Sequence, residues 1–219
     1  MAPQPQADYL VRITTPKTKG TGILIAPDLV LCCAHEVESA STAQVHIARH
    51  AIRAKVEHRD DDPKKQRDLA LLRLDDKVTA LQLPWLVNLF KQTPVRLRGH
   101  WQGEVVSAET QVISVRHIES KARILSFDVD PAALEEMSGG VALVQICDQT
   151  LCVGLIRKGG EDSWKSIIIG EGEVSRFLEG RATLPIFPHD RPAPPKPPPT
   201  RTSTSNPFAR NAAPSGPGG

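Results

Sequence analysis

Gly20-Thr21-Gly22-Ile23-Leu24-Ile25-Ala26-Pro27-Asp28-Leu29-Val30-Leu31-Cys32-Cys33-Ala34-His35 is the most informative stretch of this chain. Two short apolar runs lie on either side of Pro27-Asp28, a pair that is typical of a tight turn. Short runs rich in Ile, Val and Leu are typical of strands, so we expect a β-hairpin here. Its second run leads into His35, whose imidazole can take up a proton near neutral pH.

The chain before its Pro-rich end continues this pattern of short strands. Turn residues separate them at fairly even spacing, and long helical periodicity is missing, which predicts an all-β fold. We expect two similar β units joined near Leu81 to Gln92, and one helix at Glu173 to Glu179. The other expected strand segments are Val45 to Val56, Leu69 to Leu74, Val95 to Leu97, Gly103 to Val106, Thr110 to Val115, Ile124 to Val129, Gly140 to Ile146 and Leu151 to Ile156.

Three strings along the chain bring together the parts of an activated serine. They are Cys32-Cys33-Ala34-His35, Arg67-Asp68-Leu69-Ala70-Leu71-Leu72 and Glu136-Met137-Ser138-Gly139-Gly140. A histidine that accepts a proton, an acid that orients it and a serine make such a nucleophile. Taken singly, each residue has an ordinary alternative as a strand-end histidine, a loop cap or a turn serine.

The three strings, in this order, resemble the signatures of the trypsin-like serine protease superfamily, especially its compact bacterial and HtrA-type branches, over Tyr9 to Gly180. The resemblance implies two antiparallel six-stranded β-barrels with the active site between them and a C-terminal helix. Residues 1–90 would form the N-terminal barrel with the histidine and aspartate. Residues 91–180 would form the C-terminal barrel with the serine and the helix, and residues 181–219 a Pro-rich tail.

The resemblance also implies the catalytic roles. His35 would take the proton of Ser138, and Asp68 would hold the imidazole in the right tautomer. The backbone N–H groups of Glu136 and Ser138 would form the oxyanion hole. Glu136 stands where the family usually has glycine, and we expect this side chain to lower turnover, because it can reorient the peptide or place a negative charge near the oxyanion.

The resemblance assigns a substrate site as well. The base of the specificity pocket would fall near Ala132, with Gly159 on its wall. No carboxylate stands there, so we expect small or medium apolar side chains rather than Lys or Arg. Residues Leu155, Ile156 and Arg157 would pair with the substrate as an added strand.

Composition limits the other classes of function. The 219 residues are 40% hydrophobic and have a formal net charge of +2, which argues for neither a nucleic-acid nor a membrane partner. No apolar stretch has the length of a membrane span, and the first residues lack a signal peptide, so we expect a cytoplasmic protein. The four cysteines show no pair of CxxC motifs; we expect free thiols, no metal and no cofactor.

The last segment differs from the rest in composition. Most of the 19 prolines follow Arg181, and the run Pro194-Pro195-Lys196-Pro197-Pro198-Pro199 excludes helix and sheet ladders. We expect a disordered or polyproline II tail that acts as a spacer, with docking to a proline-binding domain as the alternative.

Three hypotheses of function follow. The first is an intracellular serine endopeptidase that hydrolyses polypeptides through an acyl-enzyme. The second is a pseudoprotease or peptide-binding module that keeps the cleft. The third is a latent protease that a protein partner activates, as in a bacterial regulatory or conflict system, an idea that rests on analogy.

Overall fold

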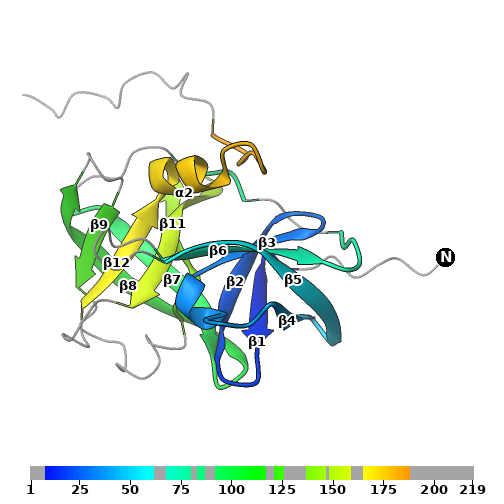
Figure 1. Ribbon diagram of the computed structural model, residues 1–219. Coiled ribbons are helices and arrows are strands. Elements are labelled where there is room, and N and C mark those ends of the chain that lie inside the picture. The colour runs from blue at the N-terminus through cyan, green and yellow to red at the C-terminus, as the bar shows by residue number, and fades with distance from the viewer. Residues whose placement is uncertain are drawn as a thin grey trace, which may run out of the picture. The chain divides into compact units, whose positions relative to one another are not determined.

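The computed structural model describes residues 8–61, 68–79, 83–86, 92–116, 121–125, 137–146, 148–158 and 165–187 (Figure 1). All of them belong to one compact unit, Met1–Phe187. The disordered tail was predicted to begin at residue 181, but the chain stays packed on the core up to Phe187: Leu184 is buried, and the Trp85 N–H donates to the carbonyl of Pro185 (2.7 Å). The rest of the predicted tail lies outside the described residues. Within these ranges, no helix has the length and apolar character needed to cross a membrane.

The first six strands form a closed antiparallel barrel. Their order around it is β1-β2-β3-β6-β5-β4, and β4 pairs back onto β1. The predicted hairpin is confirmed, because Ile23 pairs with Leu31 across the Pro27-Asp28 turn. The strands are β1 (Leu10–Thr14), β2 (Lys19–Ala26), β3 (Leu29–Cys32), β4 (Thr42–Ile47), β5 (His50–Asp60) and β6 (Leu69–Leu74).

The other six strands form a second antiparallel sheet in the order β10-β11-β12-β9-β8-β7. Strand β7 also pairs with β10, over Arg96 to Arg98. The helix α2 (Glu171–Leu178) follows β12 directly, and its Val174, Phe177 and Leu178 are buried as the sequence predicts. The strands are β7 (Pro94–Trp101), β8 (Glu104–Arg116), β9 (Lys121–Leu125), β10 (Val141–Ile146), β11 (Gln149–Lys158) and β12 (Lys165–Gly170). The all-β prediction and the C-terminal helix are therefore confirmed.

One predicted segment, Val45 to Val56, is divided in the structure. It forms the end of β4 and the start of β5, which pair as a hairpin. The turn between them includes Ala48, whose φ of 52° lies in the left-handed region. Turns of this kind usually contain Gly or Asn, and this one contains neither, so the sequence has no signal for it. A second difference is that Gly103 to Val106 and Thr110 to Val115 belong mostly to one long strand, β8.

Strand β3 shows why the two sheets pack together. Its alternate side chains enter two different cores: Val30 and Cys32 lie inside the first barrel, whereas Leu29 and Leu31 face the second sheet. A strand that is buried on both faces reads as a continuous apolar run rather than an alternating one. The run Leu29–Cys32 has this character.

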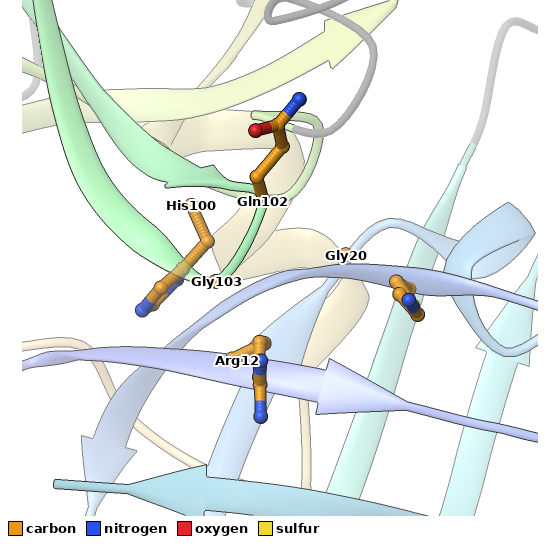
Figure 2. Close-up of a pocket in the computed structure, with 6 residues that line it drawn as sticks. Arg12, Gly20, His100, Gln102 and Gly103 are labelled. Atoms are coloured by element: carbon orange, nitrogen blue, oxygen red, sulfur yellow. The ribbon is translucent and has the colours of Figure 1, made fainter.

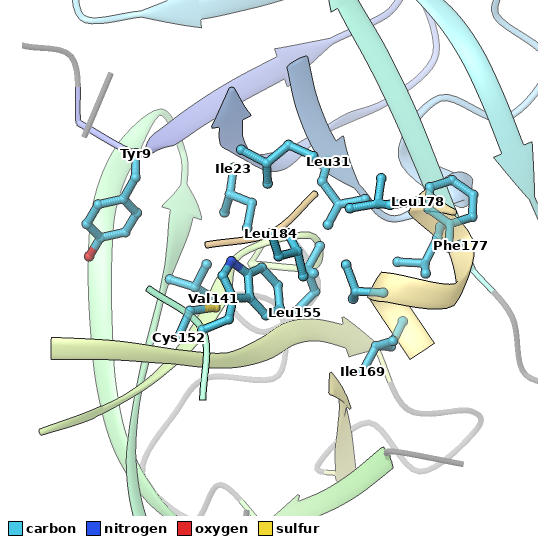
Figure 3. Packing of buried hydrophobic residues seen from close by; sticks show 14 of the residues in the cluster. Tyr9, Ile23, Leu31, Val141, Cys152, Leu155, Ile169, Phe177, Leu178 and Leu184 are labelled. Atoms are coloured by element: carbon cyan, nitrogen blue, oxygen red, sulfur yellow. The ribbon is translucent and has the colours of Figure 1, made fainter. Parts of the chain in front are cut away.

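A shared core joins the two sheets and the helix (Figure 3). Leu31 of the first barrel, Leu155 and Ile169 of the second sheet, and Leu178 of α2 meet there. Trp85, only 1% exposed, belongs to the same core. The N–H of the next residue, Leu86, donates to the carbonyl of Cys152 in β11 (2.8 Å). Apolar burial of this extent holds the two sheets against each other, and with them the residues at their junction.

Candidate active site

His35 and Asp68 lie at adjacent ends of paired strands. His35 belongs to the short 3-10 helix η1 (Ala34–Glu36) just after β3, and Asp68 immediately precedes β6. Because β3 and β6 pair with Cys32 opposite Ala70, the two side chains meet. The His35 Nδ1 atom lies 2.7 Å from Asp68 Oδ2, and the His35 backbone N–H donates to Asp68 Oδ1 at 3.0 Å. Asp68 thus fixes both the ring and the backbone of His35.

Ser138 lies on a turn that is bonded to both sheets. Its carbonyl accepts a hydrogen bond from the N–H of Thr21 in β2 (3.2 Å). The next residue, Gly139, donates its N–H to the carbonyl of Ile156 in β11 (2.8 Å). Gly139 has a φ of 77°, and a Cβ there would clash with the carbonyl of Thr21. Only glycine fits this position, which explains the Ser-Gly pair in the sequence.

Cys33 lies between the histidine and the serine segments. Its buried thiol donates a hydrogen bond to the carbonyl of Ile156 (3.4 Å) and also interacts with the Ser138 side chain. Burial, and then the negative charges of Asp68 and Glu36, raise the pKa of this thiol well above its usual value. Cys33 is therefore a neutral thiol that packs beside the serine, not a thiolate nucleophile.

The ligand atoms of Cys33, His35 and Asp68 lie within 4.8 Å of one another, which is close enough to hold a metal ion. The protein already uses all three groups in hydrogen bonds, and Arg157 Nε donates to Asp68 Oδ2 at 3.0 Å. A guanidinium at this distance repels a second cation. The arrangement therefore fits an oriented imidazole better than a metal centre.

Glu36 approaches the other ring nitrogen of His35. Glu36 Oε1 lies 3.0 Å from His35 Nε2, and the glutamate is only 4% exposed, whereas the His35 side chain is 43% exposed. Gly20 makes room for this carboxylate, because a Cβ there would overlap with it. The imidazole thus lies between two carboxylates, that of Asp68 on Nδ1 and that of Glu36 on Nε2.

These two carboxylates change the pKa of His35. Burial by itself lowers the pKa, but hydrogen bonds to Asp68 and Glu36, together with their charges, raise it from 6.5 to about 10. Although burial alone would raise the pKa of Asp68, the hydrogen bond and the charge of His35 hold it below its usual value, and the charge of Arg157 adds to this effect. At neutral pH the pair is therefore an imidazolium beside a carboxylate.

The structure brings His35 and Asp68 into contact, and it bonds the turn that contains Ser138 to both sheets. Glu136, Ala132 and Gly159 lie outside the described residues, so the predicted oxyanion hole and specificity pocket stay predictions. Leu155 and Ile156 are buried in β11, and the N–H of Ile156 donates to the carbonyl of Gly140 (2.8 Å). Their proposed pairing with substrate also stays a prediction.

Sequence reasoning missed Glu36 and the contact of Arg157 with Asp68. Glu36 is adjacent to His35, so its presence was visible, but the bend that directs its side chain toward Nε2 was not. Arg157 was expected to pair with substrate through its backbone, which stays a prediction; its side chain binds Asp68. No sequence motif predicts either contact, because each depends on how segments distant in the sequence pack against one another.

A histidine paired with an aspartate on one barrel, with a serine turn on the adjoining sheet, is the arrangement that chymotrypsin-type serine peptidases use. The family model described as "Trypsin-like peptidase domain" matches residues 20–155, more than half of the chain. The chain belongs to this family. No curated protein sequence gives a significant match to the chain.

Several solved structures share the fold. The active form of the Rv3671c protease from M. tuberculosis is 20% identical, with a TM-score of 0.62, covering 82% of this chain and 83% of that one. A Glu endopeptidase is 19% identical, with a TM-score of 0.60, covering 82% and 91%. An inactivated protease paralogue of the scabies mite is 14% identical, with a TM-score of 0.62, covering 80% and 94%. At these identities the likeness concerns the fold alone.

Proposed function

We propose that this chain is a serine endopeptidase that cleaves polypeptides through an acyl-enzyme on Ser138. The paired hydrogen bonds from His35 to Asp68 are the observation on which the proposal rests, at 2.7 Å and 3.0 Å. They hold the ring so that Nδ1 belongs to Asp68 and Nε2 is the atom left for proton transfer. The family membership supports the same chemistry.

The proposed reaction has two steps. In the first, Ser138 Oγ attacks the peptide carbonyl while His35 Nε2 takes its proton; the C–N bond then breaks, and Nε2 gives this proton to the leaving amine. In the second, water replaces the amine, and the acyl–serine ester is hydrolysed. The backbone N–H groups of Glu136 and Ser138 would stabilise the oxyanion in both steps.

Glu36 favours a second proposal, that the resting enzyme is latent. A general base must be neutral, and the carboxylate of Glu36 at 3.0 Å from Nε2 stabilises the imidazolium instead. Ser138 is also fully buried. Substrate cleavage would then need Glu36 to leave Nε2, and a protein partner is one agent that can cause this. This latency depends on Glu36, which the described residues include, and not on Glu136.

The proposed setting is the cytoplasm. Cys32, Cys33 and Cys152 are free, buried thiols, and such thiols persist in a reducing compartment. The remaining hypothesis is a pseudoprotease that captures peptides without cleaving them. It keeps the same cleft and differs only in the reactivity of Ser138.

Labelling with a fluorophosphonate probe separates these proposals, because the probe reacts covalently with an activated serine. The full-length chain is treated across a pH series, with Ser138→Ala as the control. Labelling that appears only at alkaline pH, or near neutral pH only after Glu36→Gln, supports the latent enzyme. Absence of labelling at every pH in both the wild type and Glu36→Gln would overturn the enzyme proposal in favour of the pseudoprotease.

A further inference from the structure

A pocket of about 260 Å³ lies at the junction of the first barrel and the second sheet. Figure 2 shows the side of the pocket made by β1 and β2 facing the end of β7 and the turn after it. From the first barrel it is lined by Arg12, Lys19 and Gly20, and from the second sheet by His100, Gln102 and Gly103.

The lining is basic. Arg12 and Lys19 are the charged residues in it, and within the described ranges neither has a carboxylate partner. Arg12 lies over the turn after β7, close enough that a Cβ added at Gly103 would be only 2.9 Å from Arg12 Nη1. Two cations without counter-ions in a concave site attract an anion. A guanidinium also offers paired donors that match a carboxylate or a phosphate group.

His100 adds an unsatisfied polar atom. Its Nδ1 is buried and is, in the described part of the chain, the single buried side-chain nitrogen or oxygen with no hydrogen-bond partner. The ring reaches from β7 toward β1, the strand of Arg12 (Figure 2). Burial and the nearby positive charge of Arg12 lower the pKa of His100, which keeps the ring neutral. A neutral imidazole can present one N–H, and a buried donor without an acceptor is costly.

The neighbouring carboxylates are already engaged. Asp8 pairs with Arg98 at 3.4 Å, and Glu36, whose carboxylate lies against Gly20, is bonded to His35. Neither of them lines the pocket. The positive charge of the pocket is therefore available to a ligand from outside.

The position of the pocket relates it to the proposed chemistry. Nε2 of His35 gives its proton to the leaving amine, so groups beyond Nε2 face the C-terminal part of the substrate. The carboxylate of Glu36 contacts Nε2 and also lies against Gly20. Gly20 in turn forms part of the pocket wall. The backbone of His100 is held beside Gly20, because its backbone N–H donates to Oγ1 of Thr21 at 2.8 Å.

We infer that this pocket binds an oxyanion on the leaving-group side of the substrate polypeptide, held by Arg12, Lys19 and the Nδ1–H of His100. The group is an acidic side chain, the C-terminal carboxylate or a phosphorylated side chain, since all three present the same oxygens. This inference rests on the proposed peptidase function, because it takes the bound polypeptide to be a substrate. The binding itself does not need Ser138 to react.

The test follows the His100 ring by NMR in the full-length Ser138→Ala chain, so that nothing is cleaved. The probes are the amides of Ala-Ala-Glu-Ala, Ala-Ala-Gln-Ala and the phosphoserine counterpart, and free-acid Ala-Ala-Ala-Ala. We expect saturable shifts of the His100 resonances with the anionic peptides and none with the Gln peptide. Comparing the free-acid, Glu and phosphoserine peptides identifies the source of the oxyanion.

Substitutions provide the second arm. Arg12→Ala should weaken binding of the anionic peptides about 10-fold or more, as expected for loss of a charge-assisted hydrogen bond. Lys19→Ala, at an exposed position, tests the same charge without disturbing the core. Arg49→Ala, at an exposed turn of the first barrel, is the matched control and should have no effect.

Binding of all three anionic peptides no tighter than that of the Gln peptide, or unchanged binding of the anionic peptides in both Arg12→Ala and Lys19→Ala, would overturn the inference. Its failure is distinguishable from failure of the proposed function. If only the anion site is wrong, Ser138 of the wild type is labelled but His100 does not respond to anions. If only the peptidase proposal is wrong, His100 responds to anions but Ser138 is never labelled.

Discussion

The Glu36→Gln substitution gives the most direct test of how His35 is controlled. It removes one negative charge 3.0 Å from Nε2 and keeps the size of the side chain. The carboxylates of Asp68 and Glu36 together raise the pKa of His35 to about 10. With Gln at position 36, Asp68 is the remaining carboxylate beside the imidazolium, so the pKa of His35 should fall and the neutral base should appear at lower pH.

The size of the effect follows from the fraction of neutral imidazole. With a pKa of about 10, roughly one His35 ring in a hundred is neutral at pH 8, and roughly one in a thousand at pH 7. Each unit by which the pKa falls raises that fraction about tenfold in this range. We therefore expect Glu36→Gln to speed fluorophosphonate labelling at pH 7 to 8 by about tenfold or more, and to move the midpoint of the pH profile downward.

Two measurements check this. NMR titration of the His35 ring gives the pKa directly, and the labelling rate gives the consequence. Glu38→Gln is the matched control, because Glu38 is exposed and two residues away. Identical labelling profiles and His35 titrations in the wild type and Glu36→Gln would refute the reasoning. So would a wild-type His35 that titrates near 6.5.

Stability offers a readout that does not depend on catalysis. Because folding raises the pKa of His35, the stabilisation is fully present below about pH 6.5 and is lost as the pH rises through about 10. The Tm of the wild type should therefore decrease between these pH values for this reason. Glu36→Gln should show a smaller decrease, confined to a lower pH range, and Glu38→Gln should follow the wild type.

Three further substitutions test other parts of the structure. Gly139→Ala should unfold the serine turn, because the added Cβ clashes with the carbonyl of Thr21 and the positive φ costs about 1–3 kcal/mol more in backbone strain. Gly180→Ala is the control in chemical denaturation: Gly180 has a φ of 73° and no atom near the added Cβ, so this variant should show the strain alone. Trp85→Ala should lower the free energy of unfolding by about 3–5 kcal/mol, because Trp85 is only 1% exposed in the shared core. Arg157→Ala should move the labelling profile to higher pH by removing a positive charge near the His35–Asp68 pair, and Arg157→Lys should restore part of it; no movement would contradict the role of this charge.

The fold was predictable where local signals agree with packing. The Pro27-Asp28 turn between two apolar runs gave the β2–β3 hairpin, and the helix face of Val174, Phe177 and Leu178 gave α2. The β4–β5 turn was not predictable, because Ala48 adopts a left-handed conformation without a turn residue. Strand β12 (Lys165–Gly170) was also missed. Its side chains Ile168 and Ile169 enter different cores, a distinction that arises only when the sheets pack.

The candidate site likewise has contacts that the sequence predicts and contacts that only the packing determines. The pairing of His35 with Asp68 follows from a motif that fixes both residues next to paired strands, so the sequence was sufficient to predict it. The contacts that control the pair depend on side-chain direction. Glu36 turns toward Nε2 because Gly20, on another strand, leaves the space for its carboxylate. A sequence shows that a glutamate follows the histidine, but not that a glycine elsewhere makes room for it.

Glu36 lies between His35, the proposed catalytic base, and the basic pocket. Its carboxylate bonds to His35 Nε2 on one side and lies against Gly20, a wall of the pocket, on the other. An oxyanion in the pocket repels this carboxylate and so favours its departure from Nε2. An acidic substrate should therefore help to free its own base. In the wild type, peptides with an acidic leaving-group side should be cleaved faster than their Gln counterparts by a larger factor than in Glu36→Gln. Equal factors in the two proteins would show that the pocket and Glu36 act independently.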